Sequence, residues 1–148
     1  MKRMTTILIS IMMYAQLAAP PSNSVAIFEA EGVNPFNDLW KATCHVESSG
    51  NRFAIGDNGN SYGIAQIQQS RLDDYYQRTG IRFELSDMFD VDNSREVFIY
   101  YCDNPYNLEA ISRSWNGGNG WRHKKQTKDY WWKVQKFLDR YKSQRKVL

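Results

Sequence analysis

The segment Cys44-His45-Val46-Glu47-Ser48-Ser49-Gly50-Asn51 closes an apolar helical stripe with a carboxylate. The residues that precede Glu47 on that stripe recur at spacings of three or four: Phe36, Leu39, Trp40, Thr43 and Cys44. A carboxylate on a core-facing stripe costs free energy unless it is paired or protonated, and burial raises its pKa. Glu47 is therefore a candidate general acid.

Hydrophobic periodicity predicts a mainly α domain with one small β-hairpin. Helices are expected over about residues 34–49, 64–78, 92–104, 108–117 and 127–142. Asn34 or Asn37 is expected to cap the first helix, and Asp92 or Ser94 to open the third. The segment 56–60 contains Asn-Gly between two short apolar runs, which predicts the hairpin.

The first 19 residues have the features of a secretory signal peptide. A positive start and a mostly apolar run at residues 7–17 precede small alanines. The run is short for a bilayer span, and an uncleaved N-terminal anchor is the alternative. Residues 20–33 are expected to form a flexible tether, so the folded domain is expected over residues 34–148. Export would place that domain in the periplasm or cell envelope, or outside the cell.

Charge is distributed unevenly along the chain. Residues 20–121 hold seven basic and fourteen acidic residues, whereas residues 122–148 hold ten basic and two acidic ones. A basic C-terminal segment favours an anionic partner, such as a cell-wall polymer, a lipid surface or nucleic acid. A solvated helix face explains the same pattern.

Cys44 and Cys102 are the two cysteines of the chain. Export would permit a disulfide between them, and burial as two small apolar residues is the other interpretation. The sequence has no Cys-x-x-Cys motif and no ligand cluster, so we expect no metal site and no cofactor. His45 and His123 are interpreted as structural residues.

The turn with Asp57 and the segment 61–67 carry polar groups that a ligand would need. Gly63 permits close approach of a ligand or a strand, because it has no side chain. Gln66 offers an amide that both donates and accepts hydrogen bonds. An aspartate in a turn often hydrogen-bonds to its own backbone, and this explains Asp57 as readily as a role at a ligand does.

The segment 114–121 places an aromatic residue and amides among glycines. Amides at the edges of a sugar and aromatic rings on its faces suit the binding of a glycan chain. Aromatic residues such as Trp115 or Tyr62 ordinarily pack in the core, so each of these segments taken alone is only modest evidence for glycan binding.

Together these segments resemble the lytic transglycosylase (SLT-type) family and the related goose-type lysozymes. Glu47–Asn51 resembles the family's catalytic Glu-Ser segment, and Ser61–Ile67 resembles its G-x-x-Q motif. Ser114–Gly118 resembles the A-Y-N-[AG]-G motif, and Thr127–Trp131 the closing T-x-x-Y-V motif. The match covers roughly residues 35–140 in the family's order. The resemblance implies a lysozyme-like, two-lobed helical fold with a substrate cleft between the lobes.

The resemblance implies cleavage of the β-1,4 bond between N-acetylmuramic acid and N-acetylglucosamine in peptidoglycan. Glu47 would act as the single acid/base and leave a 1,6-anhydromuramic end, while proximity of the 6-hydroxyl replaces a second carboxylate. Ser61 and Gln66 would hydrogen-bond the sugars, and Asn116 and Tyr130 would orient Glu47 or the substrate. The residues expected at the substrate are Ser61, Tyr62, Gly63, Gln66, Trp115, Asn116 and Tyr130.

Two departures from the family pattern bear on the product. Trp115 stands where the family usually has Tyr, so Tyr130 or a water would have to replace that hydroxyl. Asp57 lies in a stretch that also resembles goose-type lysozyme, where an Asp across the cleft could activate water for hydrolysis. Gln68 replaces a further Asp of the goose-type enzymes, which favours transglycosylation.

The expected partner is the peptidoglycan glycan strand, acted on by a monomer that could also serve a wall-spanning secretion or conjugation machine. A second hypothesis is a catalytically silent peptidoglycan-binding module, which would bind the glycan without cutting it. A third is nucleic-acid binding through the basic segment, which predicts steeply salt-dependent binding. No DNA-binding motif supports the third hypothesis, so no nucleic acid is expected.

Overall fold

The computed structural model describes residue 34 and residues 36–145, so the predicted signal peptide and the tether at residues 20–33 lie outside the described residues. The described chain is mainly helical with a small antiparallel sheet, which confirms the mainly α prediction. The elements are α1 (Asn37–Ser48), β1 (Ile55–Gly56), β2 (Ser61–Tyr62), β3 (Ile67–Gln68), α2 (Gln69–Thr79), the 3-10 turn η1 (Leu85–Phe89), α3 (Val91–Tyr100), α4 (Leu108–Gly117), the 3-10 turn η2 (Trp121–His123) and α5 (Gln126–Arg145).

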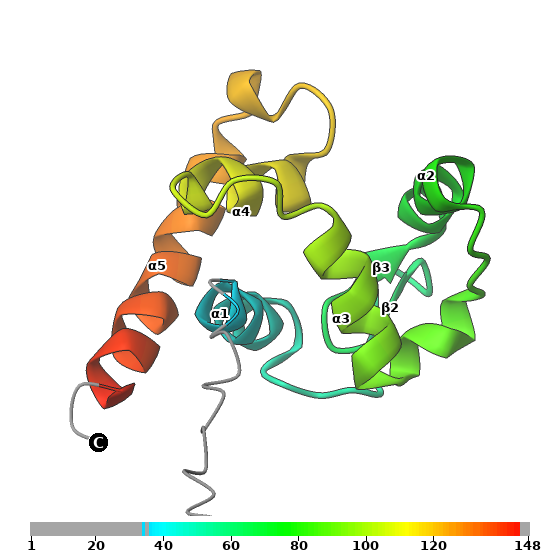
Figure 1. The fold of residues 1–148 in the computed structure, drawn as a ribbon, viewed down its shortest axis with the longest axis horizontal. Coiled ribbons are helices and arrows are strands. Elements are labelled where there is room, and N and C mark those ends of the chain that lie inside the picture. The colour runs from blue at the N-terminus through cyan, green and yellow to red at the C-terminus, as the bar shows by residue number, and fades with distance from the viewer. Residues whose placement is uncertain (1–33, 35, 146–148) are drawn as a thin grey trace, which may run out of the picture. The chain divides into compact units, whose positions relative to one another are not determined.

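Helix α1 lies at the centre of the helical part and packs most extensively on α5, which also packs on α4 (Figure 1). The three-stranded sheet and η1 pack together on the other side of α3. Leu39 of α1, Phe98 of α3 and Val134 of α5 are completely buried where these helices meet. Each such side chain stabilises the fold by about 1.5–3 kcal/mol through removal of apolar surface from water.

The end of α1 fixes the position of Glu47 in the last helical turn. Ser49 adopts a left-handed conformation with φ of 55°, and its N–H donates to the carbonyl of His45. The N–H of Gly50 then reaches back to the carbonyl of Cys44, which closes the helix in the manner of a C-terminal glycine motif. The expected side-chain cap at the other end is wrong: Phe36 occupies the N-cap, and Asn34 instead accepts from the Phe36 N–H.

The predicted hairpin is confirmed, and a third strand extends it. β1 pairs with β2 in antiparallel register, with Ile55 opposite Tyr62. β2 also pairs with β3, with Tyr62 opposite Ile67. The helix predicted from residue 64 is therefore wrong in its first turn, because Ile64–Gln68 forms a turn and a strand before α2 begins at Gln69. Gln66 has a φ of 52°, which a helix does not accommodate.

The remaining helices lie where the sequence predicts them, but α3 ends at Tyr100 rather than near Asn104, and α5 continues to Arg145 rather than ending near Lys142. α2 ends at Gly80, which adopts the left-handed conformation expected of a helix-terminating glycine. α3 is capped by Asp90, whose carboxylate accepts from two backbone N–H groups, rather than by Asp92 or Ser94. A carboxylate placed directly before the first turn satisfies these donors and complements the helix dipole. None of the helices in the described part of the chain is long and apolar enough to span a bilayer.

Gly63 holds the sheet against η1 through a close backbone approach. Its φ is +77°, and a Cβ at this position would overlap the main-chain carbonyl of Met88. Gly63→Ala is therefore expected to lower the free energy of unfolding by about 3 kcal/mol, measured by urea denaturation. Gly59→Ala is the matched control, because Gly59 has a φ of +91° with open space around it. That variant should lose only about 1 kcal/mol, and equal losses in the two variants would contradict the close-approach explanation.

Candidate active site

The carboxylate of Glu47 accepts a hydrogen bond from the Tyr130 hydroxyl, with 2.7 Å between Tyr130 Oη and Glu47 Oε1. Glu47 comes from the last turn of α1, and Tyr130 comes from the first turns of α5. The extensive packing of α1 on α5 brings these two residues together. Tyr130 itself is buried, and burial together with the nearby Glu47 carboxylate raises its pKa well above the ordinary value. The phenol therefore stays protonated and keeps donating to Glu47.

Burial raises the pKa of Glu47 from 4.5 to about 7. The charge of Asp57 also raises this pKa, whereas the Tyr130 hydrogen bond and the charge of Arg71 lower it. A carboxyl group with a pKa near neutrality can give up a proton and take one back at physiological pH. The structure thus supplies the environment that the apolar stripe predicted for Glu47.

Asp57 is an exposed carboxylate held by two donors in the turn between β1 and β2. Ser61 Oγ donates to Asp57 Oδ2 at 2.5 Å, and Gln68 Nε2 donates to the same oxygen at 3.0 Å. These hydrogen bonds lower the pKa of Asp57, so its carboxylate is ionised. Asp57 has a φ of 49°, an uncommon conformation for a residue with a side chain. The pKa values of Glu47 and Asp57 are therefore shifted in opposite directions, and the charge of Asp57 contributes to the shift at Glu47.

Ser61 and Gln66 make contacts within the protein at the atoms expected to bind sugars. Ser61 is buried and donates its hydroxyl proton to Asp57. The Gln66 amide nitrogen donates to the carbonyls of Ala54 and Gly63, at 3.2 Å and 3.0 Å. These bonds stabilise the unusual backbone conformation of Gln66 and the loop before β3. Sugar binding by Ser61 and Gln66 stays a prediction.

The other residues predicted to contact substrate differ in exposure. Tyr62 is half-buried and packs against the ring of Phe89, with 5.5 Å between ring centroids. Trp115 is buried in the core, with 7% of its surface exposed, so it presents little ring surface to a sugar. Asn116 is exposed at the end of α4, and Gly63 is buried at the contact with η1. Among the predicted site residues, direct side-chain hydrogen bonds join Tyr130 to Glu47 and Ser61 to Asp57.

Arg71 belongs to the electrostatic surroundings of Glu47, although the sequence patterns did not single it out. Its guanidinium stacks on the rings of Trp115 and Tyr101, at 4.2 Å and 4.8 Å from the ring centroids. It also donates to the Trp115 carbonyl at 2.9 Å. The sequence did contain one indication of this position: Arg71 lies four residues before the buried Tyr75 on α2. That spacing places Arg71 at the edge of the apolar face of the helix.

Both cysteines are free thiols, so the possible disulfide between Cys44 and Cys102 is absent from the structure. Cys44 is buried within the core, and Cys102 is partly buried with its thiol donating to the Phe98 carbonyl at 3.4 Å. Burial raises the pKa of Cys102 to about 12 and that of Cys44 further. Both side chains therefore pack as small, unreactive groups.

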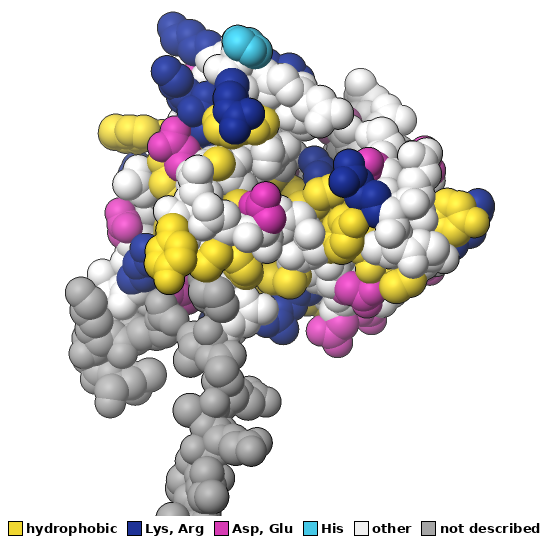
Figure 2. Space-filling model, turned by 45° about the horizontal axis from the view of Figure 1, so that its top comes forward, with side chains coloured by type: hydrophobic (Ala, Val, Ile, Leu, Met, Phe, Trp, Pro, Cys, Tyr) yellow, Lys and Arg dark blue, Asp and Glu magenta, His cyan; other side chains and the backbone are white. Residues whose placement is uncertain are grey.

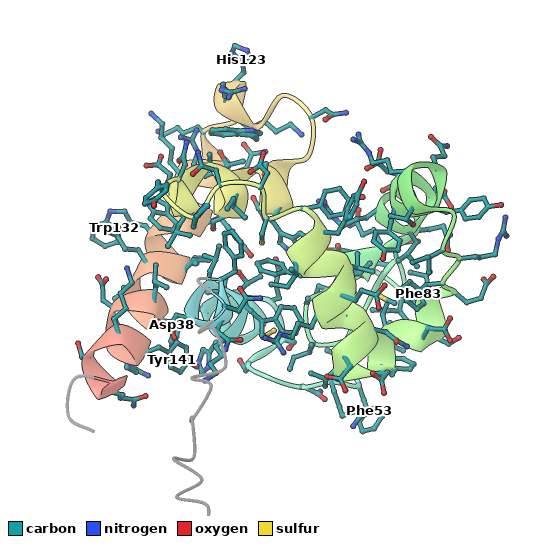
Figure 3. All side chains as sticks on the ribbon, in the orientation of Figure 1. Asp38, Phe53, Phe83, His123, Trp132 and Tyr141 are labelled. Carbon is teal, nitrogen blue, oxygen red and sulfur yellow. The ribbon has the colours of Figure 1, made fainter. Side chains whose placement is uncertain are left out.

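The histidines and the acidic residues form no metal-binding cluster in the part of the chain that the structure describes. His45 packs on the ring of Phe137, with 3.9 Å between ring centroids, which agrees with its interpretation as structural. His123 is exposed on η2 and points away from the helices (Figure 3).

The basic C-terminal segment is exposed on η2 and α5. Figure 2 shows Lys and Arg side chains gathered at one edge of the molecule beside a histidine. The exposed basic residues of this part are Arg122, Lys124, Lys125, Lys128, Lys133, Lys136, Arg140 and Lys142. Their exposure is compatible with an anionic partner and with a solvated face alike, so the anionic partner stays a prediction.

Two hollows lie outside the immediate contacts of Glu47. One, of about 200 Å³, lies between α1 and the end of α5, where Tyr141 points toward α1 (Figure 3). The other, of about 450 Å³, lies between the segment 105–109 and α5. Glu47 lines neither of these two hollows.

Comparisons with protein families, curated proteins and solved structures find no match to this chain. The chemistry of the site must therefore be inferred from its own geometry. That geometry consists of a carboxyl group with a pKa near neutrality, a phenol that donates to it, an ionised carboxylate and a cation. Such a set suits proton transfer to and from a substrate oxygen.

Tyr130→Phe is expected to raise the pKa of Glu47 above its value of about 7, because the hydroxyl stabilises the ionised form. A pH titration of the Glu47 side-chain carboxyl by ¹³C NMR would measure the shift. Tyr75→Phe is the matched control, since Tyr75 is also buried and donates to a glutamate, Glu96. The Tyr75 variant should leave the Glu47 pKa unchanged. An unchanged pKa in the Tyr130 variant would show that the hydrogen bond does not stabilise the carboxylate.

Proposed function

We propose that this protein is an exported enzyme that cleaves the β-1,4 bond between N-acetylmuramic acid and N-acetylglucosamine in peptidoglycan. The observation that carries the proposal is the environment of Glu47, a partly buried carboxyl group with a pKa of about 7 and a hydrogen bond from Tyr130. Cleavage of a glycosidic bond needs a group that protonates the leaving oxygen, and a carboxyl group with a raised pKa does this near neutral pH. The resemblance of four segments to lytic transglycosylases names the substrate.

In the transglycosylase route, Glu47 performs both proton transfers. It first donates its proton to the glycosidic oxygen as the bond from that oxygen to the muramic acid C1 breaks. The resulting Glu47 carboxylate then takes the proton of the muramic acid 6-hydroxyl, whose oxygen bonds to C1. This leaves a 1,6-anhydro end and restores the protonated Glu47. The pKa of about 7 suits both transfers, and the internal nucleophile gains from proximity.

A second candidate reaction, hydrolysis, is favoured by the state of Asp57. Its ionised carboxylate interacts with Glu47 and is fixed by Ser61 and Gln68. In a two-carboxylate glycosidase one group is protonated and the other is ionised, and these are the states that the two environments favour. Gln68, which replaces an Asp of the goose-type enzymes, here supports Asp57 directly. Water would then add to C1, and the product would carry a reducing end.

The fold that we propose for this activity is a lysozyme-like, two-lobed domain. The support is a mainly helical unit with a small antiparallel sheet that carries one carboxylate, while α1 carries the other. In such a fold the glycan would lie across the sheet and the end of α1, between Asp57 and Glu47. The proposed setting is the periplasm or the cell envelope, with a monomer acting on glycan strands or within a wall-spanning secretion or conjugation machine.

The deciding experiment digests purified peptidoglycan with the protein and reads the new ends by mass spectrometry. Anhydro ends support transglycosylation, and reducing ends support hydrolysis. Binding of peptidoglycan with no new ends would overturn the enzymatic proposal in favour of a glycan-binding module. Absence of both binding and cleavage would overturn the proposed substrate.

A further inference from the structure

Arg71 is a partly buried cation that forms no ion pair within residues 36–145 of the structure. The charge of Asp74, an acidic residue of the same helix, raises the pKa of Arg71, but the Asp74 carboxylate contacts other groups. Asp74 pairs with Arg78 at 2.9 Å and accepts from the Tyr101 hydroxyl at 2.8 Å. Burying a charge without an opposite charge is costly, so most buried charges in proteins are paired.

The guanidinium of Arg71 is nevertheless held in one place. The rings of Trp115 and Tyr101 pack on it, and the Trp115 carbonyl accepts one of its N–H groups. In addition, the Tyr101 hydroxyl donates to the backbone carbonyl of Arg71, which ties α2 to the end of α3. A guanidinium has five N–H donors, and one of them is used here, so the rest can bind a carboxylate in bidentate geometry.

The guanidinium of Arg71 stacks on Trp115, which directly precedes Asn116, one of the residues expected at the substrate, and the charge of Arg71 lowers the pKa of Glu47. Glycosidic cleavage builds positive charge on the anomeric carbon. An uncompensated cation nearby opposes that charge, whereas a cation already neutralised by an anion on the substrate does not. The site is therefore better matched to a glycan that brings its own negative charge than to a neutral one.

We propose that Arg71 binds a carboxylate carried by the glycan substrate and makes the enzyme selective for acidic over neutral glycans. This inference rests on the proposed function and deepens it. Trp115, which departs from the family pattern, acquires a role here because its ring and its carbonyl hold the guanidinium. In peptidoglycan the carboxylate has two sources, the lactyl group of a peptide-free muramic acid and the side chains and ends of the stem peptides.

The experiment compares glycans that carry a carboxylate with glycans that lack one, and one pair differs in the lactyl carboxylate alone. The substrates are peptide-free glycan strands, the same strands with the lactyl carboxylate converted to an amide, peptide-bearing strands, and chitin oligosaccharides. Wild-type kcat/KM for the peptide-free strands should exceed that for their amidated form by about 10- to 100-fold, as expected for a charge-assisted bidentate pair. A comparable preference confined to peptide-bearing strands over chitin would assign the bound carboxylate to the stem peptide.

Variants at Arg71 then test whether this residue is responsible for the preference for acidic over neutral glycans. Arg71→Gln should reduce the acidic-to-neutral ratio to near one, while Arg71→Lys should retain part of it because the charge remains. Equal wild-type rates on acidic and neutral glycans would overturn the inference without any variant, as would an unchanged ratio in Arg71→Gln. If wild type cleaves no glycan at all, the proposed function fails instead, so the two failures are distinguishable.

Discussion

Glu47→Gln is expected to reduce the cleavage rate of peptidoglycan by about 10³-fold or more. Glutamine has no acidic proton to transfer, and loss of a general acid lowers the rate by about 10²- to 10⁴-fold. The transglycosylase route would also lose its general base. The amide is nearly isosteric with the carboxyl group and can still accept the Tyr130 hydrogen bond. The measurement is the initial rate of release of soluble fragments from purified peptidoglycan.

Glu96→Gln is the matched control for this substitution, because Glu96 also accepts a tyrosine hydrogen bond but lies away from Glu47 on α3. The Glu96 variant should retain activity within a few-fold of wild type. Full activity in Glu47→Gln would refute both catalytic routes, since each requires a proton from this residue.

The same substitution should make the protein more stable at alkaline pH. The folded-state pKa of Glu47, about 7, lies above its ordinary value of 4.5, so ionisation is disfavoured in the folded protein. The contribution of protonated Glu47 to the free energy of unfolding is therefore fully present below the unfolded-state pKa, and it is lost as the pH rises through the folded-state pKa. Glu47→Gln avoids this loss and should gain roughly 3 kcal/mol at pH 8 and almost nothing at pH 4, measured by urea denaturation. If Glu47→Gln gains stability and loses activity, Glu47 serves catalysis at the expense of stability.

Asp57→Asn is expected to distinguish hydrolysis from transglycosylation, because the two routes predict very different losses of cleavage rate. If Asp57 acts directly at the anomeric carbon or on the attacking water, the loss should be about 10²- to 10⁴-fold, and reducing ends should disappear. If Glu47 acts alone, the rate should stay within a few-fold of wild type and anhydro ends should persist. Asparagine can still accept from Ser61 and Gln68, so the turn should keep its structure.

The Asp57 variant also has an expected pH signature that holds for both routes. Asp57 raises the pKa of Glu47 through its negative charge, so removing that charge should lower the Glu47 pKa. The alkaline limb of the rate profile, which follows loss of the Glu47 proton, should then move to lower pH. Asp73→Asn removes an exposed carboxylate of α2 that accepts from Gln69 and serves as the control. A shift of equal size in that control would show that the effect is not specific to Asp57.

The sequence predicted the helices where apolar spacing and end signals agree. α4 begins after Asn107, whose side chain accepts from the Ala110 N–H, and ends at Gly117, as expected. The sequence-based prediction failed at residues 64–68, where the three-residue spacing of Ile64 and Ile67 fits a helix although the segment forms a turn and then β3. The left-handed backbone of Gln66 and the pairing of β3 with β2 decide this segment. Pairing between strands depends on residues distant in sequence, so local periodicity does not report it.

The sequence by itself identified Glu47 as a candidate general acid, because a carboxylate on a core-facing apolar stripe costs free energy unless it is paired or protonated. It also indicated Tyr130 and Asp57 as partners through the resemblance of short segments. Only the tertiary structure decided what each partner does. The packing of α1 on α5 brings the Tyr130 hydroxyl to Glu47, the turn between β1 and β2 holds Asp57 ionised, and the Trp115 and Tyr101 rings bring in Arg71. A pKa depends on distances and burial in space, which the order of residues along a chain does not contain.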